Sequence, residues 1–155
     1  FKDDNPDPRG AEDIEFLIAT NPGATTGSLS KVASGGELSR ISLALQVVAA
    51  NTATSPTIVF DEVDVGIGGG VAEVVGDLLR KLGERSQVLV VTHQPQVAAK
   101  GHQHLLVTKT GEDFLHSELI LLAGESRIEE VGRMLGGAKL TESTLAHARE
   151  MLEST

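Results

Sequence analysis

Two short apolar segments rich in β-branched residues, 57–60 and 87–91, constrain the fold of this chain more than any other feature. Between them, residues 71–82 repeat apolar side chains at helical spacing, and Gly83 marks the end of that helix. A strand, a helix and a strand in this order form a βαβ unit, in which the two strands run parallel. The sequence therefore predicts an α/β fold in which the carboxyl ends of both strands meet at one edge of a sheet.

The remaining patterns add elements to this unit, and we expect a mostly parallel sheet flanked by helices, with added antiparallel strands. The further expected strands are 14–20, 104–109 and 114–121, and the further expected helices are 35–50, 127–135 and 141–152. The helix at 35–50 carries apolar residues on nearly every side, which indicates a buried helix.

The first residues of the chain differ in character from the rest. Residues 1–13 include a charged stretch with Pro6 and Pro8, which predicts a flexible lead-in. Residues 14–155 then form one domain, long enough to bury a core. Because the chain opens with Phe1 rather than Met, we expect it to be a piece of a longer protein.

Composition excludes several classes of function. Hydrophobic residues make up 40% of the chain, which excludes a disordered acidic tail. The net charge of -9 offers no basic face, so extensive direct contact with DNA is not expected of this piece. The absence of cysteine excludes disulfides and fits a reducing cytoplasm. No apolar run reaches the roughly 20 residues of a membrane helix.

An acidic pair, Asp61 and Glu62, directly follows the first of the two parallel strands. Ligands of parallel sheets bind at this edge, so Asp61 can anchor Mg²⁺ and Glu62 can polarise a water for attack on a phosphate. Taken alone, an acidic pair in a solvated turn explains the same residues equally well.

Thr92 and His93 end the second strand in the same way, and parallel pairing places them at the edge where Asp61 and Glu62 lie. A histidine there can hydrogen-bond a terminal phosphate and sense its loss. A lone histidine at a strand end is more often structural, but two polar strand ends that converge favour a site.

The segment Ser34-Gly35-Gly36-Glu37 begins the helix expected at 35–50. Serine followed three residues later by glutamate is a capping box. Capping does not explain two glycines, each of which costs a helix up to about 1 kcal/mol relative to alanine. Glycines at a helix start allow an anion to approach the backbone closely, which points to a phosphate.

The other candidate residues carry weaker signals. The glycine-rich segment 66–70 has no lysine, and the chain contains no G-x-x-x-x-G-K-[ST] phosphate loop. Asp64 can face a partner across an interface or serve as a turn aspartate. His102 and His104 suggest a solvated strand face rather than a metal site. The charged residues of the helix at 127–135 resemble a solvent-facing polar side; they are Arg127, Glu129, Glu130 and Arg133.

Together these motifs, in this order, resemble those of an ABC-type ATPase. Ser34 to Glu37 resembles the signature motif, 57–62 the Walker B strand with its catalytic glutamate, 63–66 the D-loop, and His93 the switch histidine. The form SGGELSR is similar to the SMC-like branch of that superfamily. The segments VASGGELSRISLAL, IVFDEVDVGIGG, VTHQPQVAAKGHQHLLVTK and RIEEVGRMLGG resemble the RecN family of bacterial DNA repair proteins, over about 16–152.

The resemblance implies the C-terminal lobe of a P-loop ATPase head, completed by an N-terminal part of the same protein that carries Walker A. Two such heads would sandwich two ATP molecules. It implies that Asp61 anchors Mg²⁺, that Glu62 activates water and that His93 contacts the γ-phosphate in cis. The trans contacts would come from the signature residues Ser34, Gly35, Gly36 and Glu37, and Asp64 would communicate across the dimer.

The implied process is DNA double-strand-break repair and recombination in the bacterial cytoplasm at the nucleoid, with DNA held elsewhere in the full-length protein and a recombinase as a further partner. Because Walker A is absent, we expect this chain alone to be inactive. Two alternatives remain: the head of another SMC-like or Rad50-like ATPase, and a non-catalytic dimerisation module.

Overall fold

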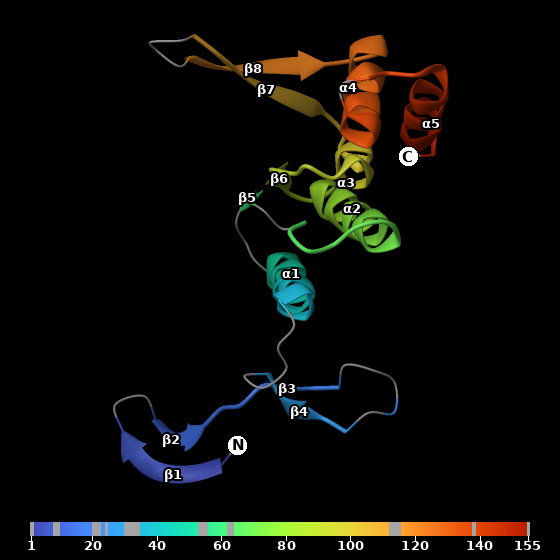
Figure 1. Ribbon diagram of the computed structural model, residues 1–155. Helices are drawn as coiled ribbons and strands as arrows, with labels where there is room; N and C mark the ends of the chain where they lie inside the picture. The colour runs from blue at the N-terminus through green and yellow to red at the C-terminus, as the bar shows by residue number, and fades with distance from the viewer. Residues whose placement is uncertain are drawn as a thin grey trace.

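The computed structural model describes residues 2–7, 10–19, 23, 25–29, 35–52, 56–61, 64–111, 116–137 and 139–154. Figure 1 shows the strands β5 to β8 on one side of the helices α2 to α5. The described strands form four two-stranded sheets, one parallel and three antiparallel, and together with the helices they confirm the α/β prediction.

The βαβ unit lies at the centre of the chain as predicted. Strand β5 (Thr57–Phe60) pairs in parallel with β6 (Gln87–Val90), and helix α2 (Gly70–Gly83) connects them. Strand β7 (His104–Thr110) pairs antiparallel with β8 (His116–Leu122). Helices α1 (Gly35–Thr52), α4 (Glu125–Gly136) and α5 (Glu142–Glu153) complete the expected set.

The first part of the chain differs from expectation. Within the segment expected to be a flexible lead-in, β1 (Lys2–Asp7) and β2 (Gly10–Asp13) form an antiparallel hairpin that was not predicted. Pro6 is tolerated because it lies where the register shifts, between Asp3 and Asp7, so the ladder does not need its missing amide. The strand expected at 14–20 is shorter: only β3 (Leu17–Ile18) forms, paired with β4 (Gly27–Ser28).

The core lies between the βαβ unit and two helices. It comprises Leu43, Val47, Ala50, Phe60, Ile67, Ala72, Val75, Leu79, Leu82 and Val97. Helix α1 contributes only one face to this core, since Leu45 and Val48 on its other sides are exposed. The prediction of a helix buried on all sides is therefore wrong for this chain.

Helix α3 (Pro95–Lys100) was not predicted, although Pro95 at its first turn is a common start signal. Its C-terminal carbonyl groups are held by two arginines. Arg80 donates to the carbonyl of Lys100 at 2.7 Å. Arg127 donates through Nη2 to the carbonyls of Gly101 at 2.6 Å and Ala99 at 3.1 Å.

Arg127 is thus half-buried and caps a neighbouring helix, which corrects the prediction of a solvent-facing residue. Burial and the nearby charge of Arg80 lower the pKa of Arg127. Glu130, from the same expected polar side, is also buried and accepts two hydrogen bonds from Arg133. Burial, followed by the charge of Arg127, lowers the pKa of His104, which is half-buried rather than solvated.

We expect Leu79→Ala to lower the free energy of unfolding of the chain by about 2–5 kcal/mol, since it leaves a cavity in the core. Leu78→Ala is the matched control on the same helix: Leu79 is 5% exposed and Leu78 is 42% exposed. Urea unfolding followed by circular dichroism measures both. Equal losses for the two variants would contradict the assigned core.

Replacing Arg127 with methionine should lower the free energy of unfolding by about 1.5–3 kcal/mol, because hydrogen bonds from a charged donor to buried carbonyls are lost. Arg149→Met removes a guanidinium from an exposed pair with Glu125 at 3.3 Å and should cost less than about 1 kcal/mol. The same urea titration compares them. A smaller loss for Arg127→Met than for Arg149→Met would argue against the capping role.

Candidate functional site

The carboxyl ends of the two parallel strands meet, as the sequence predicts. Phe60 is in register with Val90, and the amide of Val91 donates to the carbonyl of Phe60 at 2.9 Å, so pairing continues one step beyond β6. Asp61 follows directly and is exposed at this edge. Thr92 and His93 follow on the neighbouring strand.

Several predicted site residues cannot be placed in this arrangement. Ser34 and Glu62 lie outside the described residues. The backbones of Gly35, Gly36 and Glu37 form the first turn of α1. Within the described ranges no group of three or more His, Asp or Glu side chains could hold a metal ion, so Asp61 as a Mg²⁺ ligand stays a prediction.

Asp64 is the most buried polar residue of the region, with 1% of its surface exposed. Its Oδ2 accepts hydrogen bonds from the hydroxyl of Thr92 and from the backbone amides of His93, at 3.0 Å, and Gln94, at 3.2 Å. These donors, which lie just before helix α3, offset the cost of burying the carboxylate. The sequence left open whether Asp64 faces a partner across an interface or serves as a turn aspartate. Its side chain accepts hydrogen bonds from its own chain, and a role across the dimer stays a prediction.

The turn that carries Asp64 is anchored at a second point. The side-chain amide of Gln94 donates to the carbonyl of Ile67 at 3.0 Å, and the Ile67 side chain is buried in the core. Gly66 has a φ of 76°, a conformation that glycine adopts without strain. The turn and the segment 92–94 therefore form one hydrogen-bonded unit.

The side chain of His93, which belongs to the segment 92–94, contacts Asp64 and Gln94 and remains open to solvent. Its side chain is 67% exposed, and its Nδ1 lies 3.3 Å from Oδ1 of Asp64. Its Nε2 lies 3.2 Å from Nε2 of Gln94. An exposed imidazole held on both sides at the carboxyl edge of a parallel sheet is well placed to meet a ligand there.

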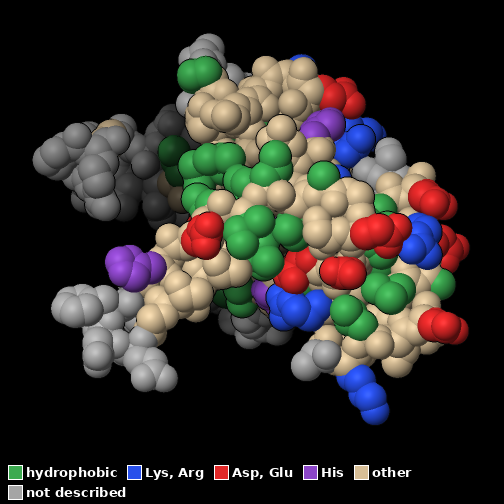
Figure 2. All heavy atoms as spheres, turned by 90° about the horizontal axis from the view of Figure 1, so that it is seen from above, with side chains coloured by type: hydrophobic (Ala, Val, Ile, Leu, Met, Phe, Trp, Pro, Cys, Tyr) green, Lys and Arg blue, Asp and Glu red, His purple; other side chains and the backbone are tan. Residues whose placement is uncertain are grey.

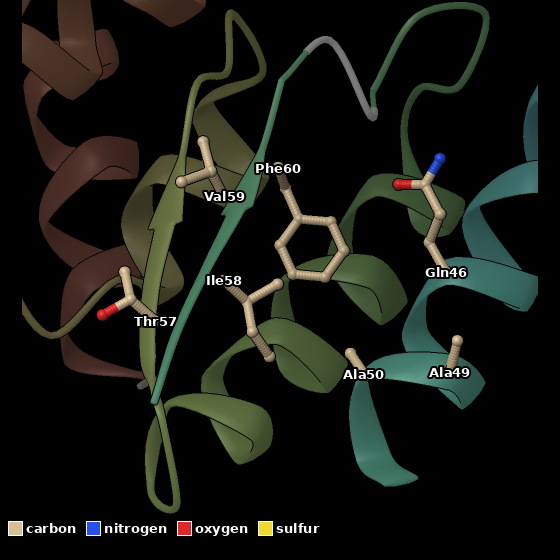
Figure 3. Close-up of a pocket in the computed structure, with 7 residues that line it drawn as sticks. All are labelled: Gln46, Ala49, Ala50, Thr57, Ile58, Val59 and Phe60. Carbon is tan, nitrogen blue, oxygen red and sulfur yellow. The ribbon is translucent and has the colours of Figure 1, made fainter. Parts of the chain in front are cut away.

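A separate groove of about 420 Å³ runs between α1 and β5. Figure 3 shows Ile58 and Phe60 pointing from β5 toward the helices, with Thr57 and Val59 on the other face of the strand. Gln46, Ala49 and Ala50 line the groove from α1. None of the described residues that line it is titratable, so we do not assign the candidate site to it.

Sequence reasoning missed how Asp64, Thr92 and Gln94 act together. The available signal was a hydroxyl residue and an amide residue on either side of His93, directly before the proline that begins α3. Neither residue type identifies its partner by spacing, because Asp64 is separated from them by a whole helix.

No family model matches the chain, but known proteins resemble it in sequence and in structure. The DNA repair protein RecN of Xylella fastidiosa strain Temecula1 is 54% identical over 153 residues, covering 98% of this chain and 28% of that protein. RecN of Vibrio cholerae is 54% identical over 146 residues, covering 94% of this chain and 26% of that protein. The chain thus spans about a quarter of the length of the curated relatives it matches.

Solved SMC structures share the fold. The SMC head domain from Thermotoga maritima superposes with a TM-score of 0.52 at 28% identity, covering 66% of this chain and 37% of that one. A chain from a structural study of ATP-driven dimerization and DNA-stimulated activation of SMC ATPases gives 0.60 at 21% identity, covering 77% and 79%. Over nearly its whole length the chain is therefore a RecN-like sequence, matching the C-terminal part of those proteins, and it has the fold of an SMC head.

Proposed function

We propose that this chain is the C-terminal half of an SMC-like ATPase head that acts in DNA double-strand-break repair and recombination. ATP binding would bring heads together and hydrolysis would release them. The observation that carries the proposal is the meeting of Asp61 and the exposed His93 at the carboxyl edge of a parallel sheet, in a sequence similar to RecN over 98% of its length.

The residues at this edge suit a nucleotide with Mg²⁺. Mg²⁺ is usually held by one or two carboxylates together with substrate phosphates, and Asp61 offers such a carboxylate. When bound, the ion supplies positive charge that stabilises the phosphates. Glu62 would accept a proton from the attacking water, and His93 would donate a hydrogen bond to the terminal phosphate.

The signature residues would serve a second head. In α1 the backbone amides of Gly35, Gly36 and Glu37 belong to the first helical turn, where amides lack helical partners. Such amides favour an anion. We assign them, together with Ser34, to the phosphate of the nucleotide held by the partner head.

Exposed apolar strand faces support completion by another part of the protein. In the parallel pair, Val59, Leu89 and Val91 are exposed. In the antiparallel pair, Leu105 lies opposite Leu121 and Val107 opposite Leu119, and all four are exposed. Figure 2, which views the molecule from above, shows hydrophobic side chains in a band across the centre of that face.

A parallel sheet is normally covered on both faces, and a sheet of two strands needs further strands or packing against helices to be stable. We therefore propose that the N-terminal part of the same protein, bearing Walker A, adds strands and covers these faces. The groove along β5 would be filled in the same assembly. With a net charge of -9, this part leaves DNA contact to the rest of the protein.

The proposed location is the cytoplasm, at the nucleoid, and a recombinase is the further proposed partner. In the part of the chain that the structure describes, no helix has the length and apolar character that a membrane crossing requires.

Glu62→Gln in the full-length protein should abolish ATP turnover and leave ATP-bound dimers trapped, because glutamine cannot accept the proton of the attacking water. Steady-state hydrolysis and size-exclusion chromatography with ATP measure the two effects. Glu84→Gln is the control: this exposed residue follows α2, before β6 begins, and its replacement should leave turnover unchanged.

Wild-type turnover by Glu62→Gln would remove Glu62 as the base and favour the non-catalytic dimerisation module.

The 155-residue chain alone should bind ATP weakly and hydrolyse none, because it lacks Walker A. Robust turnover by the chain alone would contradict the shared site.

A further inference from the structure

The two carboxylate oxygens of Asp64 have different contacts. Oδ2 accepts hydrogen bonds from the hydroxyl of Thr92 and from the backbone amides of His93 and Gln94, which fixes the backbone of the segment 92–94. Oδ1 is buried and has no hydrogen-bond partner of standard geometry among the described residues. It lies 3.3 Å from Nδ1 of His93, within ion-pair distance. The backbone is therefore held by one oxygen, and the other faces the imidazole.

A buried carboxylate oxygen is costly unless a proton donor faces it. Nδ1 of His93, 3.3 Å away, is the nitrogen that can carry such a hydrogen. Asp64 therefore favours the tautomer and the ring orientation in which Nδ1 carries hydrogen. The remaining nitrogen, Nε2, then lies on the side of the ring away from the carboxylate, on a side chain that is 67% exposed.

Gln94 supports the same tautomer from the other side of the ring. Its amide nitrogen already donates to the carbonyl of Ile67 at 3.0 Å, which orients the amide group. The same nitrogen lies 3.2 Å from Nε2 of His93. An amide nitrogen can only donate, so it matches an Nε2 that carries no hydrogen and a ring protonated at Nδ1.

We propose that Asp64 is a positioning residue that acts within its own chain on His93. It holds Nδ1 as the protonated nitrogen and leaves Nε2 on the other side of the ring, 3.2 Å from Nε2 of Gln94. To donate to a phosphate oxygen, Nε2 would have to carry a hydrogen of its own and exchange the contact with Gln94 for one with the phosphate. This inference rests on the proposed function, in which His93 meets the terminal phosphate.

The test is a double-mutant cycle of Asp64→Asn and His93→Ala in the full-length protein, with ATP turnover as the readout. Asparagine keeps the shape of Asp64 and one acceptor oxygen, which can replace Oδ2. Its NH2 group would then face the ring in place of Oδ1, and an NH2 group cannot accept a hydrogen bond from Nδ1–H. Alone, Asp64→Asn should lower kcat about 10- to 100-fold, as loss of an orienting partner typically does. KM should change less than about two-fold. In the His93→Ala background, Asp64→Asn should have no further effect.

Two further measurements complete the design. Asp77→Asn is the matched control, since this carboxylate pairs with Lys100 at 3.0 Å on the helices, and its kcat should equal that of the wild type. NMR of protein labelled with ¹⁵N-histidine reports the tautomer without ATP. In Asp64→Asn, whose amide donates to the ring, the hydrogen should move from Nδ1 to Nε2 of His93.

The outcomes separate this inference from the function on which it rests. Wild-type kcat in Asp64→Asn, with a reduced kcat in His93→Ala, would overturn the positioning role alone. Equal losses from Asp64→Asn in both backgrounds, or an unchanged tautomer, would reduce Asp64 to a structural residue and also overturn it. Unchanged kcat in His93→Ala would remove His93 from the reaction and overturn this inference, while the ATPase function, which Glu62→Gln tests separately, would stand.

Discussion

The candidate site depends on the buried carboxylate of Asp64. Ladder pairing between β5 and β6 continues to Val91, and among the described residues no ladder hydrogen bond is seen beyond it. Asp64 supplies a further connection, because it comes from the turn after β5 and accepts from the backbone after β6. Charge-assisted hydrogen bonds of this kind are strong and directional. A displacement of the turn would therefore move His93 as well.

Helix α3 extends this connection into the rest of the fold. Its N-terminus begins directly after Gln94, and its C-terminal carbonyls are held by Arg80 from α2 and by Arg127 from α4. A six-residue helix has little stability of its own, so its position is set by these contacts. The segment 92–94 is thereby attached to two longer helices, which limits how far the imidazole can move when a ligand binds.

Periodicity and end signals were enough to predict the βαβ unit and the later helices, because their apolar spacing reflects burial against one core. The sequence could not show which polar residues are internal. Arg127 has the composition of a solvent-facing helix residue, and its role follows from carbonyls contributed by another helix. Asp64 is similar, since its donors lie beyond α2. For α1 the prediction is wrong in the opposite sense: its apolar residues predicted burial, yet Leu45 and Val48 are exposed.

These exposed residues and the bare strand faces have one physical explanation. Apolar side chains that remain exposed to water form a surface that favours association with another protein or another part of the same protein. Helix α2 packs against the parallel pair, whereas the hairpin of β7 and β8 extends away from the helices (Figure 1), so the proposed partner would cover the remaining faces and extend the sheet. Because Asp61 and His93 lie at the strand ends rather than on this apolar face, such a partner could complete the sheet and leave the candidate site open at its edge. Under the proposed function, the surface for assembly and the surface for chemistry are therefore separate.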